Sequence, residues 1–368
     1  MLTPWTETSL DELLGRAGLE DAAEEPMPTD GWSGATFSML RRTDGERFVL
    51  KRDALAVNWI ARATADVHLR EAVAASAFAA RGPGIVGPLE APYLGAARDG
   101  EGAAILMPDL SQRLLAWERP SFEPGLTEET LGRIVDVVAR LHVTPWALGP
   151  RTADEPDWPW CPLRERLLLL SRPAAQAYAG GGNPVGATFL AGWDAFDGLA
   201  GADAVELIRS LSIDPAPLLD ALGRLPSVGI HGDLKLSNVA ILPSDRVALI
   251  DWEMTLRAPI AVELSWFLVS NVALLPIAPE PLFDAFHDAL RWHVGRWSSA
   301  DKHDWEGLVG DWEAQVDLAW IVGLLLRGWR KGADAVAGLT HPSGVAAIDD
   351  LRRWGEMAVQ AAGRRLRG

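Results

Sequence analysis

The sequence of 368 residues has little cysteine, little lysine and no long apolar run. Its one cysteine, Cys161, cannot form a disulfide within the chain, which is typical of proteins of a reducing compartment. The most apolar segment, LAWIVGLLLRGW, meets a charge at Arg327, and no stretch approaches the roughly 18 to 20 apolar residues that span a bilayer. The N-terminal MLTPWTETSLDE has acids where a signal peptide has basic residues. We therefore expect a cytoplasmic protein with no membrane partner.

Basic residues are also scarce relative to acidic ones. The chain has 34 Lys and Arg against 50 Asp and Glu, which gives a formal net charge of −16. Such an excess of negative charge disfavours binding to nucleic acid and to anionic membrane surfaces. The hydrophobic content of 48% allows a sizeable core, and the length is typical of two domains or lobes. The sequence therefore predicts a globular monomer or homodimer without a nucleic-acid partner.

Strand signals and one important helix characterise residues 1–110. Ser9 and Glu12 have the spacing of a capping box, which indicates a first short helix. Asp44 and Gly45 separate two apolar segments and favour the positive φ angles of a tight hairpin. The expected elements are a helix over 9–17, a hairpin of 35–42 and 46–52, a helix over 65–80, and a strand pair of 89–98 and 103–107.

Residues 111–368 have mostly helical patterns. The segment 126–142 carries apolar residues on one helical face, and similar patterns continue towards the C-terminus. The exception is 228–252, where short apolar runs alternate with polar residues and 243–245 have the composition of a turn. We therefore predict a β-rich segment within a helical region, and polar loops at strand ends are common places for functional sites.

Four polar residues of this segment have chemistry in common. They occur in HGDLKLSN and LIDWE, in a chain that has only four lysines and four asparagines. Asn238 and Asp251 offer two oxygen ligands, which suits Mg²⁺ because it keeps water and phosphate oxygens as its other ligands. Asp233 is then available to accept the proton of an attacking hydroxyl group. Lys235 is expected to neutralise charge on a transferred phosphoryl group.

A second cation is expected from the N-terminal region. Lys51 ends the strand segment RFVLK, and Glu71 lies twenty residues later in the predicted helix. We expect Glu71 to hold Lys51 in place as an ion pair, which would leave the lysine to contact the remaining phosphates.

The order of these features resembles a known family. A strand lysine, a helix glutamate, the segment LMPDL, HGDLKLSN and LIDWE follow one another as in the aminoglycoside phosphotransferase and choline kinase family, the small-molecule branch of the protein-kinase-like fold. The resemblance covers residues from about 30 to 270. It implies an α+β bilobal fold, with a small β-rich N-lobe over 1–110 and a larger, mainly helical C-lobe over 111–368. The C-lobe would hold the catalytic loop, the metal site and the acceptor pocket.

The resemblance also implies residue roles. ATP would bind between the lobes, with Lys51 on the α and β phosphates and Glu71 pairing with that lysine. Asp233 would be the catalytic base, and Asn238 and Asp251 would bind magnesium.

The adenine base is expected against the LMPDL segment. Its proline has no N–H, so the backbone donors to the base must come from Met107, Asp109 or Leu110. The loop DGWSGATF, with Ser33 and Gly34, is expected to cover the phosphates. This loop departs from the G-x-G-x-x-G pattern of protein kinases.

The predicted activity is transfer of the γ-phosphoryl group of ATP to a hydroxyl group of a small molecule. The first hypothesis for the acceptor is an aminoglycoside or another hydroxyl-rich antibiotic, which implies a role in resistance. The alternative is a sugar or a choline-like amine. A third hypothesis is a nucleotide-binding regulator without catalysis, against which the intact set of Asp233, Asn238 and Asp251 argues.

Acceptor contacts are expected from the helical lobe, chiefly from the tryptophan-rich region 292–330. Glu253 and Asp317 are predicted partners of an ammonium group, and Trp320 is a predicted stacking partner. The alternative interpretation of the tryptophans is packing in the helical core, because they recur at helical spacing.

Overall fold

The computed structural model describes most of the chain as two compact units. The described residues are 5–28, 31–82, 84–115, 126–144, 158–297 and 304–366. The first unit comprises Met1–Leu115, Pro145–Pro162 and Leu236–Thr255, and the second comprises Ala116–Thr144, Leu163–Lys235 and Leu256–Gly368. The predicted division into lobes at residue 110 stays a prediction. Among the described helices, none has the length and apolar character needed to cross a membrane.

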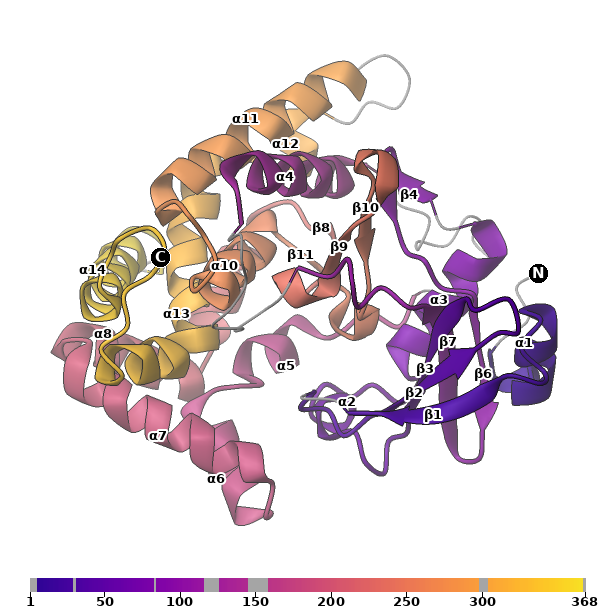
Figure 1. Cartoon of the computed structure of the whole chain (residues 1–368). Helices are drawn as coiled ribbons and strands as arrows, with labels where there is room; N and C mark the ends of the chain where they lie inside the picture. The colour runs from indigo at the N-terminus through magenta and orange to yellow at the C-terminus, as the bar shows by residue number, and fades with distance from the viewer. Residues whose placement is uncertain are drawn as a thin grey trace. The chain divides into compact units, whose positions relative to one another are not determined.

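A five-stranded antiparallel sheet is the main element of the first unit (Figure 1). Its order is β1-β2-β3-β7-β6. The strands are β1 (Ala23–Met27), β2 (Thr36–Arg41), β3 (Arg47–Asp53), β7 (Gly102–Pro108) and β6 (Gly95–Asp99). The predicted hairpin is confirmed as β2 and β3, with Gly45 at a φ of 90° in its turn. The strand pair β6 and β7 is confirmed as well.

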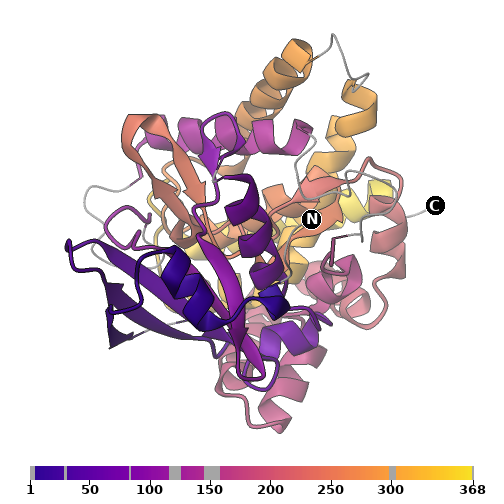
Figure 2. The ribbon, with the colours of Figure 1, turned by 90° about the vertical axis from the view of Figure 1, so that its right-hand side faces the viewer.

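Two helices pack beside this sheet, α1 (Leu10–Arg16) and α3 (Arg70–Arg81) (Figure 2). The capping box of α1 is confirmed, because Glu12 N–H donates to Ser9 Oγ and Ser9 N–H donates to Glu12 Oε2. The short helix α2 (Trp59–Ala63) precedes α3. The buried core beside the sheet consists of Leu13, Leu19, Leu40, Phe48, Leu50, Ala97, Ala104 and Leu106.

The first unit also contains a smaller sheet of order β4-β5-β10-β9. Its strands are β4 (Gly84–Val86), β5 (Leu89–Glu90), β10 (Val247–Leu249) and β9 (Val239–Ile241). The predicted hairpin is confirmed as β9 and β10, and the connecting turn η3 (Pro243–Asp245) places Ser244 and Asp245 at φ angles of 61° and 62°. The short turns η2 (Leu236–Asn238) and η4 (Trp252–Met254) flank this hairpin. Asn238, at the end of HGDLKLSN, and Asp251, in LIDWE, therefore lie at the same end of the β9–β10 hairpin.

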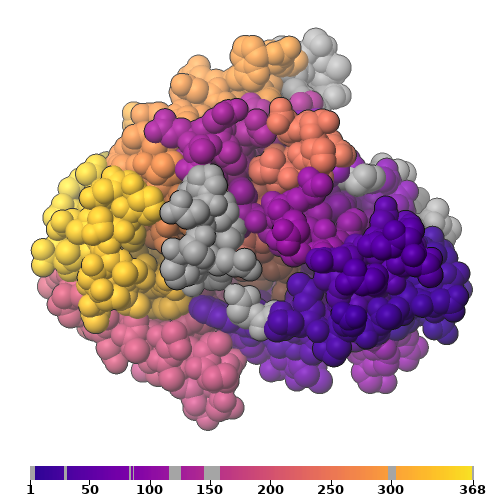
Figure 3. All heavy atoms as spheres, viewed as in Figure 1, coloured from indigo at the N-terminus to yellow at the C-terminus, as the bar shows by residue number. Residues whose placement is uncertain are grey.

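The second unit is mainly helical. Its helices are α4 (Glu128–Val143), α5 (Leu163–Leu168), α6 (Arg172–Gly180), α7 (Pro184–Leu199), α8 (Ala202–Ile213), α9 (Ala216–Leu222), α10 (Ile260–Asn271), α11 (Pro279–Trp297), α12 (Trp305–Leu308), α13 (Trp312–Val336) and α14 (Ala347–Arg365). Helix α13 packs against α7, α10 and α14, and α4 packs against α11 (Figure 1). On the face shown in Figure 3, the yellow C-terminal region adjoins the pink region of α7 and α8. The strands β8 (Val228–Ile230) and β11 (Leu256–Ala258) form a two-stranded sheet.

Candidate active site

Lys51 is buried among carboxylates of the first unit. It lies on β3, the central strand of the large sheet, and its side chain is 6% exposed. Its Nζ atom is 2.5 Å from Glu71 Oε2 and 3.1 Å from Asp251 Oδ1. Glu71 comes from the first turn of α3, and Asp251 directly precedes η4. The expected ion pair of Lys51 and Glu71 is present, and Asp251, from a third segment of the chain, also contacts Lys51.

Negative charge exceeds positive charge around Lys51. Burial opposes the charged lysine, but Asp251, Glu71 and further carboxylates hold the pKa of its ammonium well above the usual range. Burial raises the pKa of Glu71; Lys51 opposes this rise and the charge of Asp251 adds to it. Burial likewise raises the pKa of Glu253 to about 8, with Asp251 and Asp53 adding to it against Lys51. Such a surplus of buried carboxylates is typical of a functional site that receives a cation.

Tyr93 connects two of these carboxylate residues. Its hydroxyl group donates to Glu71 Oε1 at 2.8 Å and accepts the backbone N–H of Asp251 at 2.8 Å. Burial, together with the charges of Glu71 and Asp251, raises the pKa of Tyr93 well above its usual value, so the phenol keeps its proton as a donor. Lys51, Glu71, Tyr93 and Asp251 thus form a closed cycle of hydrogen bonds, which we call the Lys51 ring.

Asn58 holds the side chain of Glu253. Its Nδ2 atom donates to Glu253 Oε1 at 3.0 Å and to Asp53 Oδ2 at 2.8 Å, while its Oδ1 atom accepts Ala61 N–H at 2.9 Å as the N-cap of α2. Arg70 Nη1 donates to the Glu253 carbonyl oxygen at 3.0 Å. Glu253 is only 6% exposed. This residue, predicted to contact an acceptor, thus makes its hydrogen bonds within the first unit.

Asn238 and Asp251 lie at the same end of the β9–β10 hairpin. Asn238 directly precedes β9, and the N–H of Ile250 donates to the Asn238 carbonyl oxygen at 3.1 Å. Asn238 is buried, whereas the Asp251 side chain is 29% exposed. An amide oxygen and a carboxylate oxygen fit Mg²⁺, which takes few protein ligands and otherwise binds water and phosphate. The described residues contain no cluster of three or more His, Cys, Asp or Glu side chains arranged to hold a metal ion.

Asp233 and Lys235 belong to the second unit, in the loop after β8. The Lys235 Nζ atom is 2.8 Å from Asp233 Oδ2, and the Lys235 N–H donates to the Asp233 carbonyl oxygen at 2.8 Å. Their side chains are 19% and 12% exposed. Lys235 was expected to act on a phosphoryl group, and in this structure its ammonium pairs with the carboxylate of Asp233.

Buried side chains hold the backbone of this loop. Glu263, in the first turn of α10, accepts the N–H of His231 at 2.6 Å and the N–H of Gly232 at 3.1 Å. Arg166 of α5 donates from Nε and Nη2 to the Gly232 carbonyl oxygen at 3.1 and 2.9 Å. Burial by itself raises the pKa of Glu263, but His142, His231 and the Gly232 N–H together hold it below the usual range. A charged Glu263 therefore determines the course of the backbone just before Asp233.

The segment predicted to contact adenine lies at the end of β7. Asp109 N–H donates to the Arg47 carbonyl oxygen at 3.0 Å, and the Asp109 carboxylate pairs with the Arg47 guanidinium. Hydrogen-bonded pairs alternate along an antiparallel ladder, so Met107 pairs in the same way with Val49 two residues along. Two of the three expected donors are thus engaged within the sheet. The N–H of Leu110 donates to no described residue.

Ser33 and Gly34 lie in the loop before β2. Trp59 holds this loop in place. Its backbone N–H donates to the Ser33 carbonyl oxygen at 3.3 Å, and its indole N–H donates to the Trp32 carbonyl oxygen at 2.5 Å. Gly34 has a φ of 94°, and a Cβ atom there would lie 2.7 Å from the Val57 carbonyl oxygen, so the loop requires glycine. Asp30, the first residue of the predicted loop, lies outside the described residues.

Asp317 and Trp320 lie on α13. The carboxylate of Asp317 accepts from Arg364 at 2.6 Å and from Arg365 at 2.7 Å, and these interactions, against the effect of burial, lower its pKa. Trp320 is 1% exposed and makes an edge contact with the Trp354 ring at a centroid distance of 4.4 Å. Asp317 therefore forms ion pairs within the chain, and Trp320 packs in the core. Their contact with an acceptor stays a prediction.

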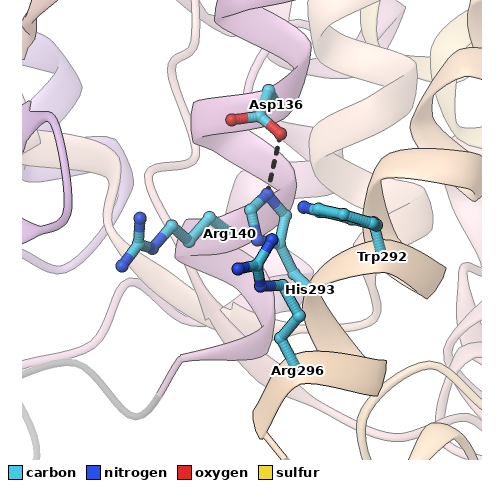
Figure 4. Close-up of a pocket in the computed structure, with 5 residues that line it drawn as sticks. All are labelled: Asp136, Arg140, Trp292, His293 and Arg296. Carbon is cyan, nitrogen blue, oxygen red and sulfur yellow. Dashed lines mark hydrogen bonds and ion pairs between the residues drawn. The ribbon is translucent and has the colours of Figure 1, made fainter.

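A cavity of about 490 Å³ lies in the second unit between α4 and α11 (Figure 4). Its lining residues are Asp136, Arg140, Trp292, His293 and Arg296. Asp136 Oδ1 is 2.9 Å from His293 Nε2. None of the individually predicted site residues lines this cavity, but Trp292, His293 and Arg296 belong to the region 292–330 predicted to contribute acceptor contacts.

Comparison with known proteins places this geometry in a family. A search of curated proteins found no match. The model of the Phosphotransferase enzyme family matches residues 29–297, well over half of the chain. The chain belongs to this family. The part matched to the phosphotransferase enzyme family includes the Lys51 ring and the Asp233 loop, whereas Asp317 and Trp320 lie beyond it.

Three solved structures are similar to this phosphotransferase family member. A choline kinase from Cryptosporidium parvum Iowa II is 11% identical with a TM-score of 0.50, and the alignment covers 96% of both chains. LicA in complex with AMP is 10% identical with a TM-score of 0.50, over 96% of this chain and 97% of that one. An aminoglycoside phosphotransferase from Alicyclobacillus acidocaldarius is 14% identical with a TM-score of 0.45, over 95% and 94%. The predicted kinase-like α+β class is confirmed, with antiparallel strands in the N-terminal part and helices in the C-terminal part.

Three residues that support the site are not predicted from the sequence, namely Tyr93, Asn58 and Arg166. Tyr93 occurs in the segment predicted as a strand, and Asn58 in a segment without a predicted element. For Tyr93 and Asn58, the available signal is the rarity of the residue type, since the chain has two tyrosines and four asparagines. The contacts of Tyr93 with the Lys51 ring, of Asn58 with Glu253 and of Arg166 with the Asp233 loop join residues 22 to 195 positions apart, so no local pattern predicts them.

Proposed function

We propose that this family member is an ATP-dependent phosphotransferase that moves the γ-phosphoryl group of ATP to a hydroxyl group of a small molecule. The observation that carries the proposal is the Lys51 ammonium, held between the carboxylates of Glu71 and Asp251. A fixed buried cation beside an acidic metal ligand suits a magnesium-bound polyphosphate. The AMP complex of a structure with the same fold supports the use of a nucleotide.

The proposed reaction is an in-line displacement. The acceptor oxygen forms a bond to the γ-phosphorus, the bond to the β–γ bridging oxygen breaks, and ADP leaves. Asp233 accepts the proton of the hydroxyl group, and the ion pair with Lys235 orients the Asp233 carboxylate before the transfer. Lys51 contacts the α and β phosphates. Magnesium held by Asn238 and Asp251 neutralises phosphate charge when it is bound.

Adenine recognition is proposed at Leu110. Its N–H remains the candidate donor to the base, because Asp109 and Met107 use theirs in the sheet. Ser33 and Gly34 are proposed to cover the phosphates from the loop that Trp59 holds.

The proposed acceptor is hydroxyl-rich, such as an aminoglycoside or another antibiotic, and the alternative is a sugar or a choline-like amine. The net charge of −16 favours a cationic compound. For a cationic acceptor, KM rises with ionic strength, because exposed charges are screened over about 8 to 10 Å. For a neutral sugar, KM hardly changes with salt.

The test is ATP consumption by the full chain with aminoglycosides, sugars, amino alcohols and nucleosides. We expect one class to be phosphorylated, and we expect Asp233→Ala to lower its turnover about 10²- to 10⁴-fold, as loss of a general base does. Nucleotide binding to this variant, followed by thermal shift, should stay close to that of the wild type. Full turnover by Asp233→Ala would remove Asp233 from the mechanism, and nucleotide binding without any phosphorylated acceptor would favour the regulator hypothesis.

A further inference from the structure

We propose that Tyr93 is a positioning residue for magnesium nucleotide: its hydroxyl group holds Glu71 and the backbone of Asp251 in the arrangement that receives the metal. The inference rests on the proposed function and goes beyond the residues that contact nucleotide or metal. It starts from the Lys51 ring, in which Tyr93 is the one member without a formal charge.

The hydroxyl group of Tyr93 is used twice. It donates to Glu71 Oε1 at 2.8 Å, while the other carboxylate oxygen of Glu71 accepts from Lys51. It also accepts the N–H of Asp251 at 2.8 Å. Glu71 is thereby fixed at both oxygens, and the position of α3 is coupled to the backbone of the residue that we propose as a metal ligand.

Asp251 needs such a restraint because of its backbone conformation. Its φ of 66° and ψ of 59° lie in the left-handed region, which is uncommon for residues other than glycine. Its side chain is 29% exposed, and its Oδ1 atom lies 3.1 Å from Lys51 Nζ. The Asp251 N–H donates to the hydroxyl group of Tyr93, a residue that is only 3% exposed.

Tyr93 itself has little freedom. Its ring stacks on Phe78 with an interplanar angle of 11°, and Phe78 packs against Trp252, the neighbour of Asp251. Its backbone N–H donates to the Ala91 carbonyl oxygen at 2.9 Å. The aromatic ring of Tyr93, without its hydroxyl group, would make the same packing contacts with Phe78. The hydroxyl group adds two directed hydrogen bonds to residues of the candidate site, and burying it without them would be unfavourable.

The chain offers a matched control, because it has only two tyrosines. Tyr178 is partly buried, and its hydroxyl group donates to the Leu169 carbonyl oxygen at 2.9 Å in the second unit. Tyr178→Phe therefore removes the same hydroxyl group without touching the Lys51 ring.

The experiment compares Tyr93→Phe and Tyr178→Phe with the wild type. The readout is the Mg²⁺ concentration that gives half of the thermal shift produced by ADP, together with kcat and KM for magnesium ATP. We expect Tyr93→Phe to raise this Mg²⁺ concentration about tenfold, as expected when a hydrogen bond that orients a charged group is lost. KM for magnesium ATP should rise with it, and Tyr178→Phe should match the wild type in all three quantities.

The outcomes separate the positioning role from a structural one. If Tyr93→Phe melts earlier but keeps the wild-type Mg²⁺ dependence, Tyr93 only stabilises the fold and the inference is overturned. If the wild type shows no magnesium-dependent binding of ADP, the proposed function fails and the positioning role fails with it. If Tyr93→Phe does not fold, amide exchange at Asp251 in the wild type decides. Protection like that of the β3 amides supports the inference, and exchange as fast as in an exposed loop overturns it.

Discussion

Each of the two units buries a lysine against a carboxylate, and the two pairs differ in their surroundings. In the first unit, Lys51 Nζ is 2.5 Å from Glu71, and in the second, Lys331 Nζ is 2.5 Å from Asp350. All four side chains are at most 6% exposed. Distance and burial alone therefore do not distinguish the two pairs.

The charges around the second pair are balanced. Burial acts to raise the pKa of Asp350, but Lys331 and His341 outweigh it and lower the pKa to about 2. The Lys331 ammonium also lies 4.5 Å from the centroid of the Trp354 ring. Asp350 is thus more easily charged in the folded chain than in water, which is the pattern of a stabilising ion pair.

The charges around the first pair are not balanced. The pKa values of Glu71 and Glu253 are raised, because burial and neighbouring carboxylates outweigh the one lysine among them. Buried charge without compensation costs stability. The second pair therefore has the charge balance of a stabilising ion pair, whereas the surplus of carboxylates at the first pair is consistent with the proposed binding of magnesium nucleotide.

The largest expected effect comes from removing each lysine. Lys51→Met should lower turnover about 10²- to 10³-fold, as loss of a group that stabilises transition-state charge does. Lys331→Met should leave turnover per folded molecule unchanged and lower the melting temperature. Steady-state kinetics on protein whose folded fraction is known from circular dichroism tests both. The comparison fails if the two variants lose turnover to the same extent.

Asp350→Asn should have the next largest effect, on stability. A pKa of about 2 in the folded chain, against an ordinary value of 3.8, corresponds to about 2–3 kcal/mol of unfolding free energy at pH 7. Because the folded pKa is the lower one, this contribution is present above about pH 4 and disappears as the pH falls towards 2. Urea unfolding of both proteins between pH 7 and 3 should show the difference shrinking. A difference independent of pH would mean that the charge of Asp350 is not the cause.

Asp53→Asn should have the smallest effect, and it should not be destabilising. Asp53 Oδ1 is buried without a hydrogen-bond partner among the described residues, and Oδ2 accepts from Asn58. An asparagine oxygen can accept that bond, while one charge leaves the acidic group around Lys51. We expect the free energy of unfolding to stay within about 1 kcal/mol of the wild type or to rise. A loss as large as that of Asp350→Asn would show that the surplus of carboxylates is not unfavourable.

Elements with local signals were predicted well from the sequence. The capping box of Ser9 and Glu12 joins atoms three residues apart, and the β2–β3 hairpin depends on the turn at Gly45. The helix predicted over 65–80 instead begins at Arg70, because Asp66 accepts the Arg70 N–H and Leu69 has a φ of 52°. Helical periodicity does not reveal this start, since it depends on a side chain that ends the preceding turn.

The sequence by itself determined the composition of the site and the short-range structure that carries it. Lys51 lies in a predicted strand and Asn238 and Asp251 flank a predicted hairpin, and both elements follow from patterns that span a few residues. Only the tertiary structure decided that Tyr93 closes the Lys51 ring, since its two partners are 22 and 158 residues away. It also decided that Trp320 packs in a core, because the burial of a tryptophan depends on which helices meet around it. Hydrogen bonds and burial of this kind are formed between distant segments, so no local pattern encodes them.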